Sequence, residues 1–216
     1  MLIVLASNNQ GKLRELKELL PGAVEVKTAG ELGVELPEET GLTFAENAFL
    51  KARAVAAATG QIAIADDSGL EVDALGSAPG VRSARFAGEP SDDARNNALL
   101  LAKLAGIPEE QRTARFQSVV AIVGPDDEAF SAQGTIEGRI LETPRGSGGF
   151  GYDPLFLIRG YNLTMAELSL DDKNAISHRA RAFRGVIEQL IALLQTYDEC
   201  RVDGTDTSDS NIEVEP

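Results

Sequence analysis

The sequence predicts an α/β fold with a mixed β-sheet, and three observations support this. Strand-like apolar runs alternate with amphipathic helical segments in the first hundred residues, an alternation typical of parallel strands joined by helices. Two later strand patterns flank the turn Gly-Pro-Asp-Asp at 124–127, which predicts an antiparallel hairpin. The chain has 216 residues, of which 43% are hydrophobic, enough for one domain with a sizeable core.

The individual elements follow from apolar periodicity and from their end signals. We expect strands at 2–6, 24–26, 61–65, 115–123, 129–136 and 155–158. Helices are expected around 13–20, at 43–59, at 91–105, and as one long helix around 176–194. Thr43 and Glu46 fit a capping box at the start of the second helix, and Gly106 and Pro108 stop the third.

The composition changes after Leu194. Residues 196–216 contain seven Asp and Glu against a single Arg, so this segment carries −6 of the formal charge of −14. It is poor in apolar residues, which is typical of disorder. The sequence therefore predicts a globular domain at 1–195 and an acidic, disordered C-terminal tail at 196–216.

Charge and composition exclude several classes of function. A net charge of −14 and a pI near 4.5 argue against nucleic acid or an anionic membrane as a partner. A single cysteine, Cys200, and a single histidine, His178, cannot form an internal disulfide or a Cys/His zinc site. The apolar start lacks a basic region and no apolar run reaches membrane-spanning length, so we expect a cytoplasmic protein.

The first chemical motif lies between the first strand and the first helix. Free N–H groups and the positive end of the helix dipole favour phosphate binding there, and a lysine adds charge. The motif consists of Ser7, Asn8, Asn9, Gln10, Gly11 and Lys12. It is not a Walker loop, because the glycine spacing and the Ser/Thr are missing. The alternative is that Ser7 or Asn9 only caps the helix.

Two further motifs place polar groups near a predicted sheet edge. Asn47 and Lys51 are four residues apart, so they share one helix face and can point into a cleft. Asp66 and Asp67 follow the strand 61–65, and strand alternation sends their side chains to opposite faces. Either carboxylate could hold Mg²⁺ or act as a general base on water. The alternative is an Asx-type turn closed with Ser68.

A glycine-rich loop at 144–153 precedes a short strand. It contains Gly-x-Gly-x-x-Gly, but the dinucleotide fingerprint needs a strand before it and a helix after it, and both are missing. We interpret it as a loop whose Phe150 or Tyr152 stacks on a planar base while Asp153 reads the base edge. The alternative is a plain glycine-rich loop.

A basic cluster lies near the start of the last predicted helix. Its members are Lys173, His178 and Arg179, and the guanidinium of Arg179 could make bidentate contacts. In a chain this acidic, such a cluster indicates an anionic ligand. The alternative for the lone His178 is a purely structural role.

Taken together, these motifs resemble the inosine triphosphate pyrophosphatase family, also called the Ham1 or dITP/XTP pyrophosphatase family. The resemblance rests on the segments 7–12, 43–48, 65–70, 148–154 and 177–179, which occur in the family's order. It implies a two-lobed ITPase-like (Maf/Ham1) fold, with helices flanking a long mixed sheet, for the domain 1–195. It also implies a Mg²⁺-dependent homodimer that hydrolyses purine nucleoside triphosphates (dITP, ITP and XTP) to the monophosphate and pyrophosphate.

The same resemblance implies roles for individual residues. Asp67 would be the catalytic base or metal-bound acid, and Glu38 a second metal carboxylate. The residues implied to bind substrate are Ser7, Asn8, Asn9, Gln10, Gly11, Lys12, Lys51, Ser68, Phe150, Gly151, Tyr152, Asp153, Lys173, His178 and Arg179. The family often has Thr-Gly-Asn where this chain has Ser-Asn-Asn at 7–9, a difference that bears on the geometry of the phosphate loop.

Two other functions share some of these features. A Maf-type pyrophosphatase for pyrimidine or modified nucleotides would open on Ala-Ser-x-Ser-x-x-Arg, which Asn9 and Lys12 do not match. A non-catalytic nucleotide sensor would keep Lys12, Phe150 and Arg179 but would have no use for Asp67.

Overall fold

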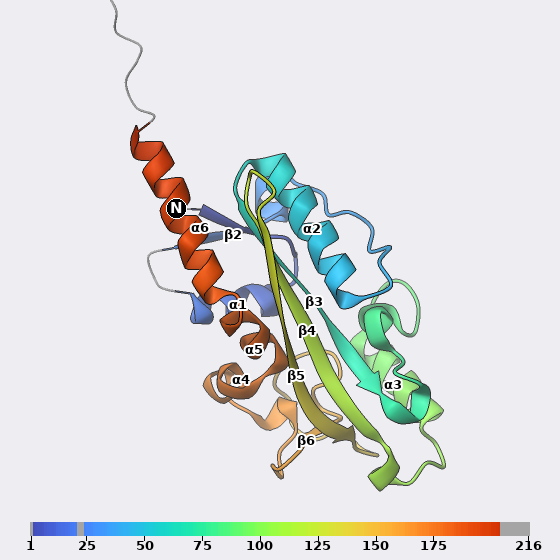
Figure 1. Ribbon diagram of the computed structural model, residues 1–216. Coiled ribbons are helices and arrows are strands. Elements are labelled where there is room, and N and C mark those ends of the chain that lie inside the picture. The colour runs from blue at the N-terminus through green and yellow to red at the C-terminus, as the bar shows by residue number, and fades with distance from the viewer. Residues whose placement is uncertain (1, 21–23, 204–216) are drawn as a thin grey trace, which may run out of the picture.

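One mixed sheet organises the computed structural model, which describes residues 2–20 and 24–203 (Figure 1). Its strands are β1 (Leu2–Leu5), β2 (Glu25–Thr28), β3 (Ile62–Val72), β4 (Thr113–Val123), β5 (Ala129–Ile140) and β6 (Phe156–Ile158). Their order is β2-β1-β3-β4-β5-β6. The first three strands are mutually parallel and the last three pair antiparallel, so the predicted α/β fold with a mixed sheet is confirmed.

Helices cover both faces of this sheet. They are α1 (Gln10–Leu19), α2 (Phe44–Thr59), α3 (Asp93–Lys103), α4 (Leu170–Ile176), α5 (His178–Arg184) and α6 (Ile187–Asp203). Figure 1 shows α2 on one side and α1, α5 and α6 on the other. The predicted capping box of Thr43 and Glu46 is present at the start of α2. Gly60, with φ of 61°, ends α2 in the left-handed conformation that glycine favours.

The central strand β3 separates two apolar cores. Ile62 and Ile64 pack into the core formed with α1, α5 and α6. Ala63 and Ala65 face the opposite way and pack against the alanine-rich face of α2. Small side chains on both partners let α2 lie close to the sheet. This alternation continues along the strand, so Asp66 is directed toward α1 and α5 and Asp67 toward α2.

The long strands β3, β4 and β5 carry a third apolar core at their far end. Leu70 of β3 packs there with Leu100 of α3 and Phe156 of β6. In Figure 1, α3 and β6 lie at the lower end of these strands, away from β1 and β2. The strands therefore connect two lobes, each with its own helices and apolar residues.

β3 is longer than the sequence indicates, which changes the setting of the two aspartates. The expected strand ended at Ala65, but β3 continues to Val72 because β4 pairs with it as far as Val72. The partner on the other edge stops earlier, since β1 pairs with β3 only as far as Ile64. Asp66 and Asp67 therefore lie inside the strand, at the point where one edge loses its neighbour.

The C-terminal helical region differs from the single long helix that the sequence predicts. Ser177 has an extended backbone and its side chain caps α5, which breaks the chain between α4 and α5. A glycine, Gly185, then separates α5 from α6. Gly134 of β5 allows the first turn of α5 to lie very close to the sheet, because a Cβ at this position would overlap the carbonyl oxygen of His178.

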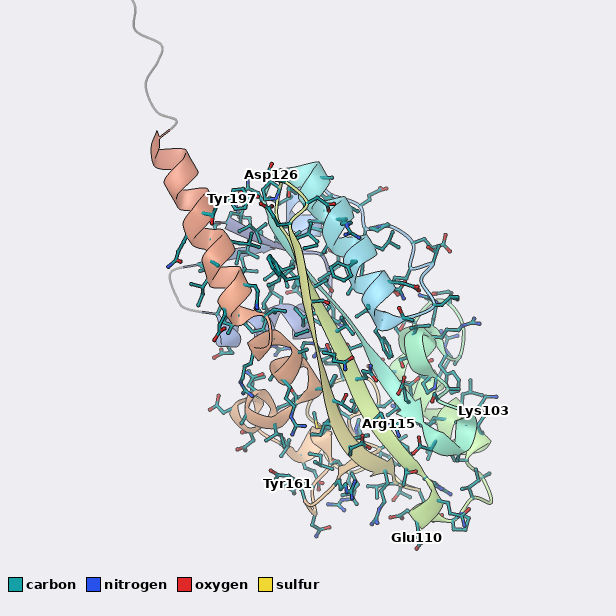
Figure 2. All side chains as sticks on the ribbon, viewed as in Figure 1. Lys103, Glu110, Arg115, Asp126, Tyr161 and Tyr197 are labelled. Atoms are coloured by element: carbon teal, nitrogen blue, oxygen red, sulfur yellow. The ribbon has the colours of Figure 1, made fainter. Side chains whose placement is uncertain are left out.

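The last helix extends into the segment that was expected to be a disordered tail. α6 continues through residues 196–203, and Tyr197 packs against the first core. Its hydroxyl donates to Oε2 of Glu128 at 2.8 Å and lies 3.0 Å from Oδ2 of Asp126 (Figure 2). The expected tail therefore begins within α6, and its remainder, 204–216, lies outside the described residues. Across residues 2–20 and 24–203, no helix has the length and apolar character that spanning a membrane requires.

Candidate functional site

A cavity of about 310 Å³ opens beside β3, just where β1 stops pairing with it. Segments that are far apart in the sequence meet in its wall. The predicted site residues that line it are Ser7, Asn9, Lys12, Lys51, Asp67, Ser68, Phe150, Gly151, Tyr152, Asp153, Lys173, His178 and Arg179. Asn8, Gln10, Gly11 and Glu38 do not line it. The fold therefore gathers most of the predicted residues around one cavity.

Asp66 joins three separate elements through its carboxylate. Oδ1 lies 3.0 Å from Nζ of Lys12, which α1 carries. Oδ2 accepts from Nε of Arg179 on α5 at 2.9 Å and from the hydroxyl of Ser68 at 3.1 Å. The Ser68 oxygen in turn accepts from Nη2 of Arg179 at 3.0 Å. All four side chains belong to one network, and Lys12, Ser68 and Arg179 within it line the cavity.

The backbone of Asp66 takes part as well. Because β1 no longer pairs with β3 here, the Asp66 carbonyl accepts from Nζ of Lys51 at 3.0 Å and from Nζ of Lys12 at 3.2 Å. Two lysines from different helices therefore converge on one carbonyl. The missing strand neighbour is replaced by cations that face a potential anionic ligand.

These surroundings fix Asp66 in its ionised form. Burial alone would raise its pKa, but the charges of Lys12, Arg179 and Lys51 outweigh burial and hold the pKa of this carboxyl far below its usual range. Burial also lowers the pKa of Lys12, helped by the nearby cations and opposed by Asp66. A carboxylate with so low a pKa is a poor proton acceptor. Asp66 is therefore suited to hold cations in place.

Asp67 has the opposite character. Its side chain lines the cavity, where Nδ2 of Asn47 donates to Oδ2 at 3.2 Å and Nζ of Lys51 lies 3.3 Å from Oδ1. Burial raises its pKa, and the neighbouring carboxylate of Glu39 adds to the rise, although Lys51 opposes it. Of the two adjacent aspartates, the chemistry of a general base or a metal carboxylate therefore fits Asp67.

The second carboxylate at the cavity is Glu39, whereas Glu38 is exposed and lies outside the cavity wall. Glu39 Oε1 lies 2.6 Å from Nζ of Lys51, and Nη1 of Arg85 donates to Oε2 at 3.2 Å. Nη2 of Arg85 also holds the Glu39 carbonyl at 3.2 Å. The structure therefore brings Glu39 to the cavity, and the role of Glu38 as a metal carboxylate stays a prediction. An irregular loop has no periodicity to show which side chain faces inward.

The phosphate loop is only partly free for a ligand. Oδ1 of Asn9 caps α1 by accepting from the amides of Gly11 (2.8 Å) and Lys12 (3.2 Å). Oδ1 of Asn8 accepts from the amide of Gly30 at 3.2 Å, which fastens the loop to the segment after β2. Asn9 therefore caps α1 and also lines the cavity, together with Ser7 and Lys12.

At another part of the wall, Phe150 lies beside two cations. Lys173 Nζ is 4.9 Å and the Arg179 guanidinium carbon 5.6 Å from the ring centroid, within cation–π range. Asp153 Oδ2 lies 2.9 Å from Lys173 Nζ and accepts from the Phe150 amide at 3.1 Å. The Tyr152 hydroxyl donates to the Ser83 carbonyl at 2.8 Å, so it serves the fold. Of the two aromatic residues considered for stacking on a base, Phe150 is the more exposed.

His178 has a buried ring nitrogen in this wall without a hydrogen-bond partner among the described residues. It is 5% exposed, and its ring stacks on Phe116 with centroids 5.0 Å apart. Burial, together with the charges of Arg179 and Lys173, holds the pKa of His178 well below its usual range, so the imidazole is neutral near pH 7. Nδ1 is buried and finds no hydrogen-bond partner among the described residues. A buried polar atom of this kind is suited to a ligand contact.

Known proteins resemble this chain over most of its length. A family model described as "Ham1 family" matches residues 3–189. This chain belongs to the Ham1 family. The matched range contains every Ham1-like segment noted in the sequence, and it ends within α6.

Relatives in this family are similar over nearly their full lengths. A protein of Desulforamulus reducens named dITP/XTP pyrophosphatase is 55% identical over 88% of this chain and 96% of its own length. A dITP/XTP pyrophosphatase of Bacillus subtilis is 50% identical over 88% and 96%. The structure of a HAM1 protein from Coxiella burnetii is 44% identical over 91% of this chain and 99% of its own, with a TM-score of 0.79.

In this Ham1 protein, the two aspartates should differ sharply in their effect on stability. We expect Asp66→Asn to lower the free energy of unfolding by about 3 kcal/mol, because it leaves Lys12 and Arg179 buried without their counter-charge. Asp67→Asn is the matched control. It should cost far less, because the raised pKa of Asp67 means that the fold already disfavours its charge. Urea unfolding at pH 7 measures both.

The pH dependence of the Asp66→Asn effect follows from the lowered pKa. The stabilisation by ionised Asp66 is fully present above the unfolded-state pKa of about 3.9 and is lost as pH falls toward the lower folded-state pKa. The difference between wild type and Asp66→Asn should therefore be constant from pH 8 to about pH 5 and shrink only below about pH 4. Equal stability of the two proteins at pH 7 would contradict this assignment.

Proposed function

We propose that this protein hydrolyses non-standard purine nucleoside triphosphates, namely dITP, ITP and XTP, to the monophosphate and pyrophosphate. Such an enzyme removes deaminated purines from the nucleotide pool. The observation that carries the proposal is the cavity beside β3, where the carboxylates of Asp67 and Glu39 face the cations Lys12 and Lys51. The relatives named dITP/XTP pyrophosphatase support the substrate class.

The cations of the cavity are suited to a triphosphate. Lys12 and Lys51 come from different helices and meet at the Asp66 carbonyl, and Arg179 is fixed beside them by the Asp66 carboxylate. Preorganised positive groups stabilise the charge that develops on the departing pyrophosphate. Fixing them in advance means that little reorganisation is needed when the substrate binds.

Asp67 is suited to act on the attacking water. It is buried, faces the cavity and has a raised pKa, so its carboxylate is a stronger proton acceptor than an ordinary aspartate. Asn47 holds one of its oxygens through a hydrogen bond from Nδ2. We infer that Asp67 orients the water for in-line attack on the α-phosphorus and accepts or shares its proton.

The carboxylates of Asp67 and Glu39 also fit Mg²⁺. Hard oxygen ligands suit this ion, which in phosphoryl-transfer sites uses one or two carboxylates together with substrate oxygens. No cluster of three or more His, Cys, Asp or Glu side chains occurs within the described residues, so the remaining ligands would come from substrate and water. Glu39 raises the pKa of Asp67, a repulsion that a cation would relieve. Bound Mg²⁺ would neutralise phosphate charge and orient the α-phosphoryl group.

Selection of the base falls to the wall formed by Phe150 and His178. A purine can stack on the Phe150 ring, and the neutral imidazole of His178 offers one N–H donor and one acceptor. A donor aimed at the 6-oxo group of hypoxanthine or xanthine would be left unpaired by the 6-amino group of adenine, at a cost of about 1–3 kcal/mol.

We also propose that the protein acts in the cytoplasm as a homodimer, without nucleic-acid or membrane partners. The family resemblance and the charge of −14 support this.

A hydrolysis panel tests the proposed function. Purified protein with Mg²⁺ would be incubated with dITP, XTP, dATP, dGTP and dTTP, and pyrophosphate would be measured separately from phosphate. We expect fast pyrophosphate release from dITP and XTP and slow release from dATP. Activity only on dTTP would support a Maf-type enzyme instead, and inactivity on every triphosphate would leave a nucleotide-binding protein.

Asp67→Asn tests the assigned base. We expect kcat for dITP to fall at least ~10²-fold, the scale of losing a catalytic base, while the fold remains intact by circular dichroism. Glu35→Gln is a matched control, because Glu35 is exposed and lies outside the cavity wall. Near-normal turnover by Asp67→Asn, or an equal loss in Glu35→Gln, would refute the assignment of Asp67.

A further inference from the structure

The glycine-rich loop at 144–153 is fastened to several different elements. Asp153 is held by Lys173 of α4, and the Tyr152 hydroxyl is held by the Ser83 carbonyl. Another attachment is to α3 and is made through the backbone of Gly151. The family-like motifs include no residue of α3, although Asp93, the first residue of this helix, lines the cavity.

The attachment to α3 holds both the backbone amide and the backbone carbonyl of Gly151. The Gly151 amide donates to Oδ2 of Asp93 at 2.7 Å, and the Gly151 carbonyl accepts from Nδ2 of Asn97 at 2.9 Å. Asp93 and Asn97 are four residues apart on α3, so they project from the same face of the helix. Gly151 itself has φ of 62°, a backbone conformation that few other residues adopt without strain.

These two hydrogen bonds hold the backbone next to Phe150, the residue that we propose stacks on the nucleobase. Phe150 directly precedes Gly151, and its ring lies so close to α1 that a Cβ on Gly11 would come within 3.1 Å of it. The same ring faces Lys173 and Arg179. The position of Phe150 between these groups therefore depends on where the Gly151 backbone is held.

We propose that Asp93 and Asn97 are positioning residues that clamp Gly151 and so keep Phe150 in place to receive the nucleobase. This inference rests on the proposed function for the meaning of the base-binding wall. The apparent affinity for a ligand is proportional to the fraction of molecules whose loop is in the binding-competent position. Loosening the loop therefore weakens binding. The clamp therefore governs the affinity for the base, while the chemistry at Asp67 is unchanged.

Kinetics of three variants test the clamp. Asp93→Ala and Asn97→Ala should each raise KM for dITP about tenfold, because each removes one hydrogen bond to the Gly151 backbone. The value of kcat should change less than about threefold. Asp93→Asn keeps an oxygen that can accept from the Gly151 amide, so it should restore most of the affinity. Asp92→Ala is the matched control, because Asp92 caps α3 without contacting Gly151.

Hydrogen exchange supplies a readout that needs no substrate. We expect the Gly151 amide to exchange at least about tenfold faster in Asp93→Ala and to regain protection in Asp93→Asn, while Asp92→Ala leaves it unchanged. Amide exchange tests whether α3 holds Gly151 even if the wild-type protein hydrolyses none of the triphosphates in the panel. Failure of the clamp and failure of the proposed function are therefore distinguishable.

Three results would overturn the proposal. Unchanged KM and unchanged exchange in Asp93→Ala and Asn97→Ala would show that the grip has no effect on the loop. An equal effect in Asp92→Ala would assign it to the stability of α3. A raised KM in Asp93→Asn with full amide protection, together with normal KM in Asn97→Ala, would mean that the charge of Asp93 contacts substrate directly.

Discussion

The ion pairs of buried Asp66 with Lys12 and Arg179 are the interaction on which the rest of the site depends. They tie β3 to α1 on one side and to α5 on the other, so three elements meet at one carboxylate. Burying these charges costs desolvation energy, which full pairing offsets. What the network provides is a fixed position for two cations at the wall of a cavity, before any anion arrives.

A second constraint is the early end of β1. Because it pairs with β3 only as far as Ile64, the next carbonyl on that edge is open to Lys12 and Lys51, and the next side chains border a cavity. Strand alternation then assigns different surroundings to neighbouring carboxylates. Asp66 is buried among cations, which lower its pKa, whereas Asp67 has a raised pKa because of burial and the nearby carboxylate of Glu39. Environments that separate the pKa values of two adjacent acids also separate their roles.

Much of this could be predicted from the sequence, because local patterns carried it. The hairpin at 124–127, the capping box of α2 and the opposite directions of Asp66 and Asp67 follow from turn chemistry and periodicity, and the structure confirms them. Tertiary contacts decided the rest. The length of β3 depends on pairing with β4, the inward position of Glu39 depends on Lys51 and Arg85, and the continuation of α6 past residue 195 depends on the packing of Tyr197.

We propose that Asp66 organises the cations while Asp67 and Glu39 perform the metal-assisted chemistry. A crystal structure of the protein with Mg²⁺ and a non-hydrolysable dITP analogue tests this division of roles. We expect the metal to contact the carboxylates of Asp67 and Glu39, while Asp66 keeps its contacts with Lys12 and Arg179. A metal bound by Asp66 or Glu38, with Asp67 turned away from the substrate, would refute these roles.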